Sequence, residues 1–429
     1  MKTLNLTFAL LAMAAVAAAG DINAGTRVEV SSNPPDARDQ SAARAAFDGD
    51  KTYLVVWQQG RDFYQTENSD IYAARVSVDG KALDEKPIVV CTAEECQLSP
   101  SVAFAGGVFL VAWSDLRNGK DFDIYAARIT PDGKVLDKDG FLVAGGLRNQ
   151  YGPTVAPGDS KFLVAWQDYR DEKGYALYAG RVGADGPSAG STSSTSSGQA
   201  KVLDANGVAL GTSGKTIRGG GTLLASAGNS WFLFWQTPDA GWKTALARIE
   251  EKAGAIAVAE INARLPVNHS IHSGQMGGAA SDGKLVVCAN TVVQGLGGGA
   301  RPGNILVFDV AGCRPLRTGP DNSAEPVHIG DPGIDAPLVI AHSGGTFLMA
   351  AKGSGRAKAP YCNQIHAARL DSEGKLIEKP EAWQVLDDGA EPCSGPALAA
   401  GKDGSFLLTY SVDGGPGKQR VVARVVNTK

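Results

Sequence analysis

DIYAARITPDGKVLD, residues 123–137, is a near copy of DIYAARVSVDGKALD, residues 70–84. Each copy follows a short apolar segment that ends in tryptophan, FLVAW at Trp113 and YLVVW at Trp57. Five more versions of this segment follow along the chain: FLVAW ends at Trp166, WFLFW at Trp235, KLVVC at Cys288, FLMAA at Ala351 and FLLTY at Tyr410. Their spacing of 53 to 69 residues indicates an array of seven similar structural units.

An arginine provides a second marker of the repeat. It stands in IYAAR and its copies in six of the seven units, at Arg75, Arg128, Arg181, Arg248, Arg369 and Arg424. Unit five has Asp309, in LVFDVAG, instead. Two independent markers that stay in step over seven units establish a repeat architecture.

Each unit has the pattern of four short strands. In unit two, PSVAFAG offers small residues suited to a crowded axis, and VFLVAW is apolar throughout, as expected for a strand covered on both faces. DIYAARIT is the third strand, and an Asp-Gly turn in PDGKVLD leads to a fourth strand near FLVA. Seven such units predict an all-β fold, a seven-bladed β-propeller with four-stranded antiparallel blades.

The two ends of the chain complement each other. The last unit stops after its third strand, in VVARVVNTK, whereas TRVEVSS (residues 26–32) is a strand that precedes the first unit. We expect this N-terminal strand to complete the last blade and close the ring. Closure in this way removes two exposed sheet edges.

Residues 1–20 have the pattern of a secretory signal peptide. Lys2 is followed by an apolar run from Leu4 to Ala19, and AVAAAG supplies the small residues of a cleavage site. The run is short for a membrane anchor, which is the alternative. We therefore expect a single β-propeller domain over residues 21–429, without a membrane span in the mature chain, in the periplasm or outside the cell.

The chain has 429 residues, a net charge of −4 and six cysteines. No basic face indicates nucleic-acid binding. An oxidising compartment permits disulfides, and Cys91 and Cys96 enclose a short loop that a local bridge could close. Cys362 and Cys393 fall on the same face of neighbouring blades and form a second candidate pair. Cys288 and Cys313 are expected to stay unbridged, because several residues of strand separate them.

A low-complexity segment, GPSAGSTSSTSSGQA at residues 186–200, interrupts unit three between its third and fourth strands. Such polar, Ser-rich text indicates a flexible loop. It is interpreted as a tolerated surface insertion, and O-linked glycosylation is the alternative.

The third-strand text resembles the repeats of secreted bacterial propellers, including the periplasmic propeller of the Tol system. SDLRNGKDFDIYAARITPDGKVL carries the likeness, with its Asp-Arg turn, a short gap, DIY and an Asp-Gly turn. The resemblance covers units one to three and is faint beyond them. It implies an exported propeller and, more loosely, a binding partner, since propellers host unrelated functions.

In a propeller, two sets of connections gather around the axis on one face, which we call the mouth face. They are the connections from second to third strand and from fourth strand to the next first strand. A glutamine recurs at the start of the first strand in units one to three, at Gln40, Gln97 and Gln150. Corresponding positions hold Arg218, His272, Ile334 and Cys393. These side chains are candidate ligand-binding groups, or else partners for buried backbone groups.

A charged rim is the second candidate on this face. Asp115 and Arg117 follow the second strand of unit two, and Asp168 and Arg170 follow that of unit three. Arginine presents a planar fork to anions, which suits a polar ligand. The recurrence of these Asp-Arg pairs in consecutive units favours a structural role, because a residue that recurs in each repeat usually stabilises that repeat.

Catalytic patterns are sparse. His269 and His272, in NHSIH, reach the mouth face, and Asp331 and Asp335 belong to the next connection. Two histidines need further ligands to hold a metal, so we predict neither a metal nor another cofactor. The sequence favours an exported binding scaffold for an envelope or extracellular protein, or for a glycan. The alternative is an enzyme acting on carbohydrate or another extracellular polymer with two carboxylates across the mouth.

Overall fold

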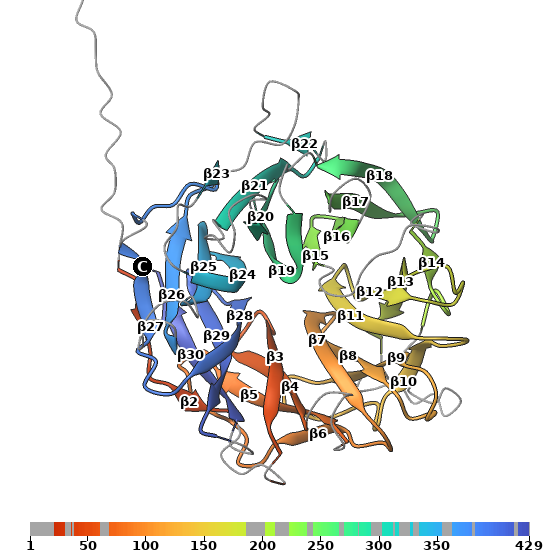
Figure 1. The fold of residues 1–429 in the computed structure, drawn as a ribbon. Coiled ribbons are helices and arrows are strands. Elements are labelled where there is room, and N and C mark those ends of the chain that lie inside the picture. The colour runs from red at the N-terminus through yellow and green to blue at the C-terminus, as the bar shows by residue number, and fades with distance from the viewer. Residues whose placement is uncertain are drawn as a thin grey trace, which may run out of the picture.

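Seven antiparallel sheets surround a central axis (Figure 1). The computed structural model describes residues 21–30, 36, 38–60, 68–185, 202–210, 223–237, 243–265, 270–281, 283–292, 303–311, 314–316, 327–328, 334–353, 363–379, 382–415 and 419–428. The predicted seven-bladed β-propeller with four-stranded antiparallel blades is confirmed. The predicted signal peptide at residues 1–20 and the insertion at residues 186–200 lie outside the described residues.

In the first three blades, the strands follow one another from the axis outward. Blade one contains β3 (Gln40–Phe47), β4 (Thr52–Gln59), β5 (Asp70–Ser77) and β6 (Ile88–Cys91). Blade two contains β7 (Gln97–Ala105), β8 (Val108–Asp115), β9 (Asp123–Ile129) and β10 (Phe141–Ala144). Blade three contains β11 (Gln150–Pro157), β12 (Lys161–Asp168), β13 (Ala176–Gly183) and β14 (Val208–Ala209).

The remaining blades keep this order. Blade four contains β15 (Leu223–Ala227), β16 (Ser230–Thr237), β17 (Lys243–Lys252) and β18 (Ala255–Leu265). Blade five contains β19 (Ser270–Ser281), β20 (Lys284–Val292), β21 (Gly303–Asp309), β22 (Arg314–Pro315) and β23 (Val327–His328). Blade six contains β24 (Ile334–Ser343), β25 (Thr346–Gly353), β26 (Ile365–Leu370) and β27 (Gln384–Asp387). Blade seven contains β28 (Cys393–Ala400), β29 (Ser405–Asp413) and β30 (Gln419–Asn427), with β1 (Asn23–Ala24) and β2 (Val28–Glu29) at its edge.

The core lies between the blades. Every residue of β4 and β8 is buried, because each second strand is covered by a neighbouring blade on both faces. Leu54 of blade one and Phe109 and Trp113 of blade two belong to one apolar cluster, and all three are fully buried. Burial of each such side chain stabilises the fold by about 1.5–3 kcal/mol. The described residues contain no α-helix, hence no helical segment that could cross a membrane.

A ring of alanines explains how seven innermost strands fit around one axis. Each strand places one alanine at the same register: Ala46 pairs with Leu54, Ala103 with Leu110, Ala156 with Leu163, Ala225 with Phe232, Ala279 with Val286, Ala341 with Leu348 and Ala399 with Leu407. Small residues allow close approach in a tightly packed interior. The small residues predicted for the axis are therefore present in every blade.

The pairings also correct the alignment of unit five. Gly277 pairs with Cys288, as Ser101 pairs with Ala112, and Cys288 packs in the cluster between blades five and six. Cys288 thus takes the place of Ala112, and Ala289 takes the place of Trp113. The apolar text KLVVC hid this one-residue shift, because a continuous apolar run does not show which face a residue occupies.

The arginines of the third strands join neighbouring blades. Arg128 is completely buried and donates from Nε and Nη2 to Asp137, at 2.8 and 2.9 Å. Its Nη1 donates to the carbonyl of Asp185 in blade three. Three other third-strand arginines donate in the same way to a backbone carbonyl of the next blade: Arg75 to Pro131, Arg181 to Gly254 and Arg248 to Ala311. These repeated arginines therefore have a structural role in each unit.

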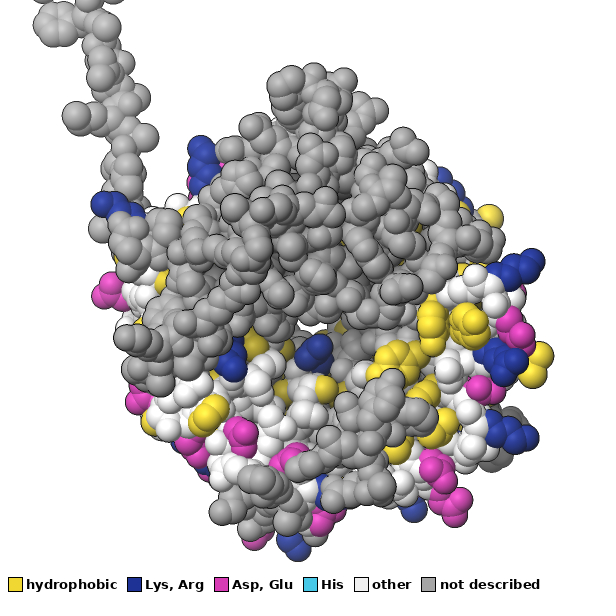
Figure 2. Space-filling model, viewed as in Figure 1, with side chains coloured by type: hydrophobic (Ala, Val, Ile, Leu, Met, Phe, Trp, Pro, Cys, Tyr) yellow, Lys and Arg dark blue, Asp and Glu magenta, His cyan; other side chains and the backbone are white. Residues whose placement is uncertain are grey.

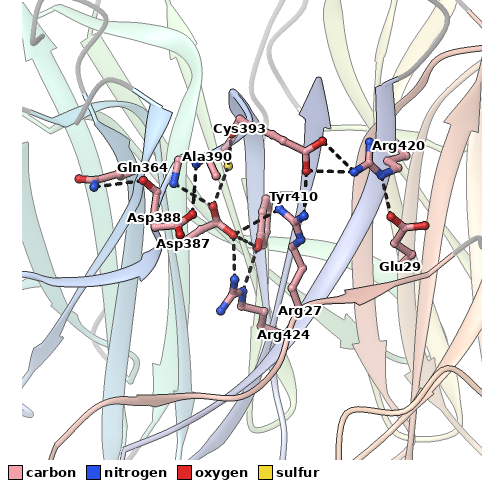
Figure 3. A network of polar contacts seen from close by, with 12 residues as sticks. Arg27, Glu29, Gln364, Asp387, Asp388, Ala390, Cys393, Tyr410, Arg420 and Arg424 are labelled. Atoms are coloured by element: carbon pink, nitrogen blue, oxygen red, sulfur yellow. Dashed lines mark hydrogen bonds and ion pairs between the residues drawn. The ribbon is translucent and has the colours of Figure 1, made fainter. Parts of the chain in front are cut away.

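The N-terminal segment closes the ring. Both β1 and β2 pair with β30, so this segment supplies the outermost strand of blade seven, as predicted. Arg27 donates to Glu391 at 2.8 Å, and Arg420 donates to Glu29 at 2.9 Å and to Glu391 at 2.8 Å (Figure 3). These ion pairs fasten the first residues of the propeller to its last strands.

A buried carboxylate lies beside this seam (Figure 3). The side chain of Asp387 is completely buried and accepts hydrogen bonds from the Tyr410 hydroxyl at 2.5 Å and from Arg424 Nη2 at 3.0 Å. Burial alone would raise the pKa of Asp387. The hydrogen bonds from Tyr410 and the Gly389 N–H, and the charge of Arg424, instead hold this pKa below its ordinary value.

Candidate functional site

The two faces of the propeller differ in their connections around the axis. The turns between first and second strands contain two to four residues, for example residues 106–107 and 344–345. The connections between second and third strands, on the mouth face, contain five to eleven residues, for example residues 116–122 and 169–175. Loops on a rigid scaffold are the usual place for binding residues. The mouth face is therefore the candidate functional face, and its described part lies mainly on blades one to three.

The three predicted glutamines lie together at the mouth ends of the first three innermost strands. Gln40, Gln97 and Gln150 are each no more than 2% exposed. Gln40 accepts from the Val421 N–H at 3.0 Å, whereas Gln97 and Gln150 donate to nearby carbonyl oxygens at 3.0 Å. Their amides thus complete backbone hydrogen bonding where each strand begins.

The remaining predicted mouth residues are only partly placed by the structure. His272 lies in β19, one residue after Ile271, which pairs with Thr291. Asp335 lies in β24, where it pairs with Lys352. Arg218 lies outside the described residues. The structure therefore places His272 and Asp335 on innermost strands.

The rim residues form a repeated buried ion pair. Asp115 is fully buried and accepts from Trp113 Nε1 at 2.7 Å, from Arg117 Nε at 2.8 Å and from Arg117 Nη2 at 2.7 Å. The Arg117 guanidinium also stacks on the Tyr125 ring, 3.9 Å from its centroid. This arginine is thus bound on three sides within the blades.

Blade three repeats this arrangement. Asp168 accepts from Trp166 Nε1 at 2.9 Å and from Arg170 Nε at 2.8 Å, and Arg170 stacks on Tyr178 at 4.1 Å. Arg170 Nη2 also donates to the Asn206 carbonyl at 3.0 Å. Both pairs hold the end of the second strand against the outer strands, so their hydrogen-bonding groups are largely occupied by the blade itself.

The structure corrects the predicted bridge between Cys91 and Cys96, because both are free thiols. Cys91 packs in the cluster between blades one and two, with Sγ 3.3 Å from Arg117 Nη2. Cys96 packs in a separate cluster with Leu98, Leu116 and Phe122. Since Cys91 ends a strand and Cys96 follows the turn, the two side chains enter different apolar layers.

The other cysteines are described only in part. Cys393 is a free thiol whose Sγ lies 3.5 Å from Asp387 Oδ1, and its candidate partner Cys362 lies outside the described residues. Cys288 is also a free thiol, with Sγ 3.5 Å from the Gly277 carbonyl, and Cys313 lies outside the described residues. Burial is the main cause that raises the pKa of Cys91, Cys288 and Cys393, each to about 12.

An apolar surface on blade three was missed by the sequence analysis. Leu147, before β11, is 77% exposed. Tyr169 and Tyr175 flank the connection from β12 to β13, with their ring centroids 5.1 Å apart, and both are partly exposed. Tyr151 begins the same blade and is also partly exposed. We call Leu147, Tyr151, Tyr169 and Tyr175 the tyrosine patch.

Figure 2 shows hydrophobic side chains gathered on this side of the face. Charged side chains border the tyrosine patch, since Arg148 and Glu172 form an exposed ion pair at 2.8 Å. The sequence held one signal for this patch. Tyr151 follows the glutamine of unit three where unit two has Leu98, and Tyr169 lies between Asp168 and Arg170 where unit two has Leu116. Among the residues that the structure describes, no group of three or more metal-binding side chains is found.

Comparison with known proteins supports the fold class. No protein-family model and no curated protein matches the chain. The polysaccharide lyase Uly1 has a similar solved structure, with a TM-score of 0.50 and 9% identity over 92% of this chain and 90% of that one. A protein of unknown function from Dyadobacter fermentans DSM 18053 gives a TM-score of 0.48 and 12% identity over 95% of this chain and 99% of that one.

The sialidase of Trypanosoma rangeli is a further similar structure, with a TM-score of 0.43 and 10% identity over 81% of this chain and 56% of that one. Likeness at such low identity concerns the fold alone. The protein is a seven-bladed β-propeller, and the likeness of its third strands to Tol-system propellers remains a prediction from the sequence.

Proposed function

We propose that this protein is an exported β-propeller that serves as a binding scaffold, with a saccharide bound on its mouth face. The observation that carries the proposal is the tyrosine patch. Exposed apolar side chains clustered within a polar surface mark interaction sites. A tyrosine offers an apolar ring and a polar hydroxyl, which match the apolar ring face and hydroxyl edge of a sugar.

The described carboxylates of the rim support a scaffold over an enzyme. Catalysis of glycoside cleavage needs two carboxyl groups that reach the scissile bond. Asp115 and Asp168 are buried, and each is held by a tryptophan and an arginine. Their positions give them a structural role. The similar fold of a polysaccharide lyase is compatible with a saccharide ligand, although fold likeness alone does not identify one.

The first test is a saccharide-binding screen with the mature chain, followed by calorimetry on each hit. Tyr169→Ala and Leu147→Ala should weaken binding by about tenfold, because they remove apolar contact to the ligand. Leu83→Ala is the matched control, since Leu83 is 44% exposed in the connection between β5 and β6, on the opposite face. Its affinity should equal that of the unaltered protein.

Three other outcomes would overturn the proposal. Equal affinity in all variants would move the site away from the tyrosine patch. Failure to bind any saccharide, with an envelope protein captured by the unaltered chain and lost in Tyr169→Ala, would identify a protein ligand. Release of new reducing ends from a bound saccharide would support the enzyme alternative.

A further inference from the structure

A single guanidinium lies on the wall of the axis among the described residues. Arg44 lies in β3 and is the only arginine or lysine in the seven innermost strands. It pairs with Val56, and the residues at the same register in the other blades are uncharged: Ser101, Thr154, Leu223, Gly277, Val339 and Ala397. The ring thus carries one positive charge, on the blade-one side.

Arg44 has no carboxylate partner among the described residues. Its Nη1 donates to the Ala43 carbonyl at 2.9 Å, which leaves Nε and Nη2 available. Arg117 and Arg170 each hold a buried aspartate, and even the exposed Arg148 holds Glu172. A guanidinium stays charged at any ordinary pH, so one without a carboxylate partner on the wall of a channel is suited to bind an anion.

The surroundings of Arg44 are those of a lined channel. The residue is solvent-accessible, yet the surrounding protein desolvates the guanidinium and lowers its pKa from the usual value. Arg44 is both solvent-accessible and desolvated because it borders the hollow axis, where protein surrounds it, and not the outer surface. Figure 2 shows basic side chains beside the central opening of the mouth face.

A cavity of about 360 Å³ lies along the axis, and its lining begins one residue beyond Arg44, towards the face opposite the mouth. Its wall is formed by the three residues that follow the Arg44 register in each innermost strand, for example Ala45, Ala46 and Phe47 in blade one. The wall is mainly alanine, valine, leucine and phenylalanine, and it includes His342 of blade six. Such a volume is at the small end of ligand pockets, so it suits one end group of a ligand.

We propose that Arg44 binds the carboxylate of an acidic sugar unit that enters the axis from the mouth face. The planar fork of arginine matches the two oxygens of a carboxylate, and charge-assisted bonds of this kind are strong. The apolar wall takes the ring face of the same unit, as small-molecule sites combine an apolar lining with a few polar groups. This inference rests on the proposed saccharide function and narrows it to uronate-type ligands.

The test compares two tetrasaccharides, one of galacturonate and one of neutral galactose, by calorimetry on the full chain. The unaltered protein should bind the galacturonate tetramer more tightly. Arg44→Gln should reduce that affinity by about 10- to 100-fold and leave the neutral tetramer unchanged. Lys81→Gln is the matched control, because it removes one exposed positive charge from the connection between β5 and β6, on the face opposite the mouth, and it should bind as the unaltered protein does.

The outcomes separate this inference from the function on which it rests. Equal binding of both tetramers, with no effect of Arg44→Gln, would overturn the role of Arg44 and leave a saccharide scaffold. Binding of neither tetramer, together with binding of a glutamate oligopeptide that Arg44→Gln abolishes, would replace the sugar by an acidic peptide. Binding of none of these probes would overturn the anion site.

A second measurement covers the case in which Arg44→Gln does not fold. A crystal of the unaltered protein soaked with galacturonate should show the carboxylate within hydrogen-bond distance of the Arg44 guanidinium. An empty axis in such a crystal, or galacturonate bound only elsewhere, would overturn the inference. Arg44→Lys should give intermediate affinity, because lysine keeps the charge and loses the planar fork.

Discussion

Asp387 occupies the place in blade six that Cys91 occupies in blade one. Both are the last residue of the outermost strand, and both face a buried group of the next blade. Beside Cys91 the buried carboxylate is Asp115, which belongs to blade two, and its neighbours are Trp113 and Arg117. Between blades six and seven, Asp387 itself is the buried carboxylate, and it accepts hydrogen bonds from Tyr410 and Arg424 of blade seven. One buried carboxylate is thus present at both of these seams, although the strand that provides it differs.

Tyr410→Phe tests this seam. The variant removes a 2.5 Å hydrogen bond to a buried carboxylate, so we expect the free energy of unfolding to fall by about 1.5–3 kcal/mol. Urea unfolding followed by tryptophan fluorescence measures it. Tyr72→Phe is the control, because the Tyr72 side chain is also buried and its hydroxyl has no hydrogen bond among the described residues. A loss of similar size in both variants would contradict the assignment.

Acid should weaken the propeller through the same carboxylate. The folded-state pKa of Asp387 lies below its ordinary value, so its stabilisation is complete above about pH 4 and is lost as the pH falls through the folded pKa. Asp36 contributes in the same window: burial opposes the shift, but bonds from Arg38 and Gln59 lower its pKa to about 2.

The urea midpoint of the unaltered protein should therefore fall between pH 5 and pH 2. Asp387→Asn should have a lower urea midpoint than the unaltered protein at pH 5. Its midpoint should fall less between pH 5 and pH 2, because the amide does not titrate. Equal slopes for the two proteins would show that Asp387 does not contribute to acid sensitivity.

Removal of the N-terminal strand should open the ring. A chain that begins at residue 33 lacks β1 and β2 and exposes the edge of β30, with its unpaired backbone groups. We expect rapid hydrogen exchange in β30 and concentration-dependent association, measured by mass spectrometry and light scattering. A chain that begins at residue 21 is the control and should behave as a closed monomeric propeller does. Unchanged exchange in β30 would contradict closure by this strand.

Arg128 and Arg148 should differ sharply in their effect on stability. Arg128→Ala leaves Asp137 buried without its partner and removes a bond to blade three, so a loss of about 3–5 kcal/mol is expected. Arg148→Ala removes an exposed ion pair with Glu172 and should have no measurable effect. Thermal and urea unfolding of the two variants under the same conditions distinguish them. Equal stability would refute the role of the third-strand arginines.

The cysteines should be unreactive until the protein unfolds. Burial raises the pKa of Cys91, Cys288 and Cys393 to about 12, so few thiolates exist at pH 8. Iodoacetamide should leave these residues unmodified in the folded protein and modify them in urea. Peptide mapping without reduction should show Cys91 and Cys96 unlinked, and a linked 91–96 peptide would contradict the structure.

The sequence was sufficient for the fold because two markers recur along the chain, an apolar second strand in all seven blades and a third-strand arginine in six. Trp113 and Arg128 have the same separation as Trp166 and Arg181, and both residue types have a structural role within the blades. The same reasoning was sufficient for the N-terminal closure, since an unpaired strand stood at each end. It failed at KLVVC in blade five, where an apolar run concealed a shift of one residue between Cys288 and Ala289.

The candidate site was less predictable because it depends on residues that differ from one blade to the next. Gln40, Gln97 and Gln150 were found by their recurrence, and recurrence marks residues that support strands. Arg44 stands alone in its ring, and only a comparison of the seven innermost strands by register reveals it. Cys91 and Cys96 were paired on sequence distance, which does not show that their side chains enter different layers.

The closing strand also sets an order in time. Val28 is among the first residues of the propeller to be synthesised, and its partner Ala423 is among the last. At ordinary rates of synthesis, about 20–80 s separate the two. Throughout that interval residues 23–29 have no strand to join, and the growing array has an open end at blade one. Ring closure therefore requires the residues that were synthesised first. Any factor that binds residues 23–29 would delay their pairing with β30, which is the final step of folding.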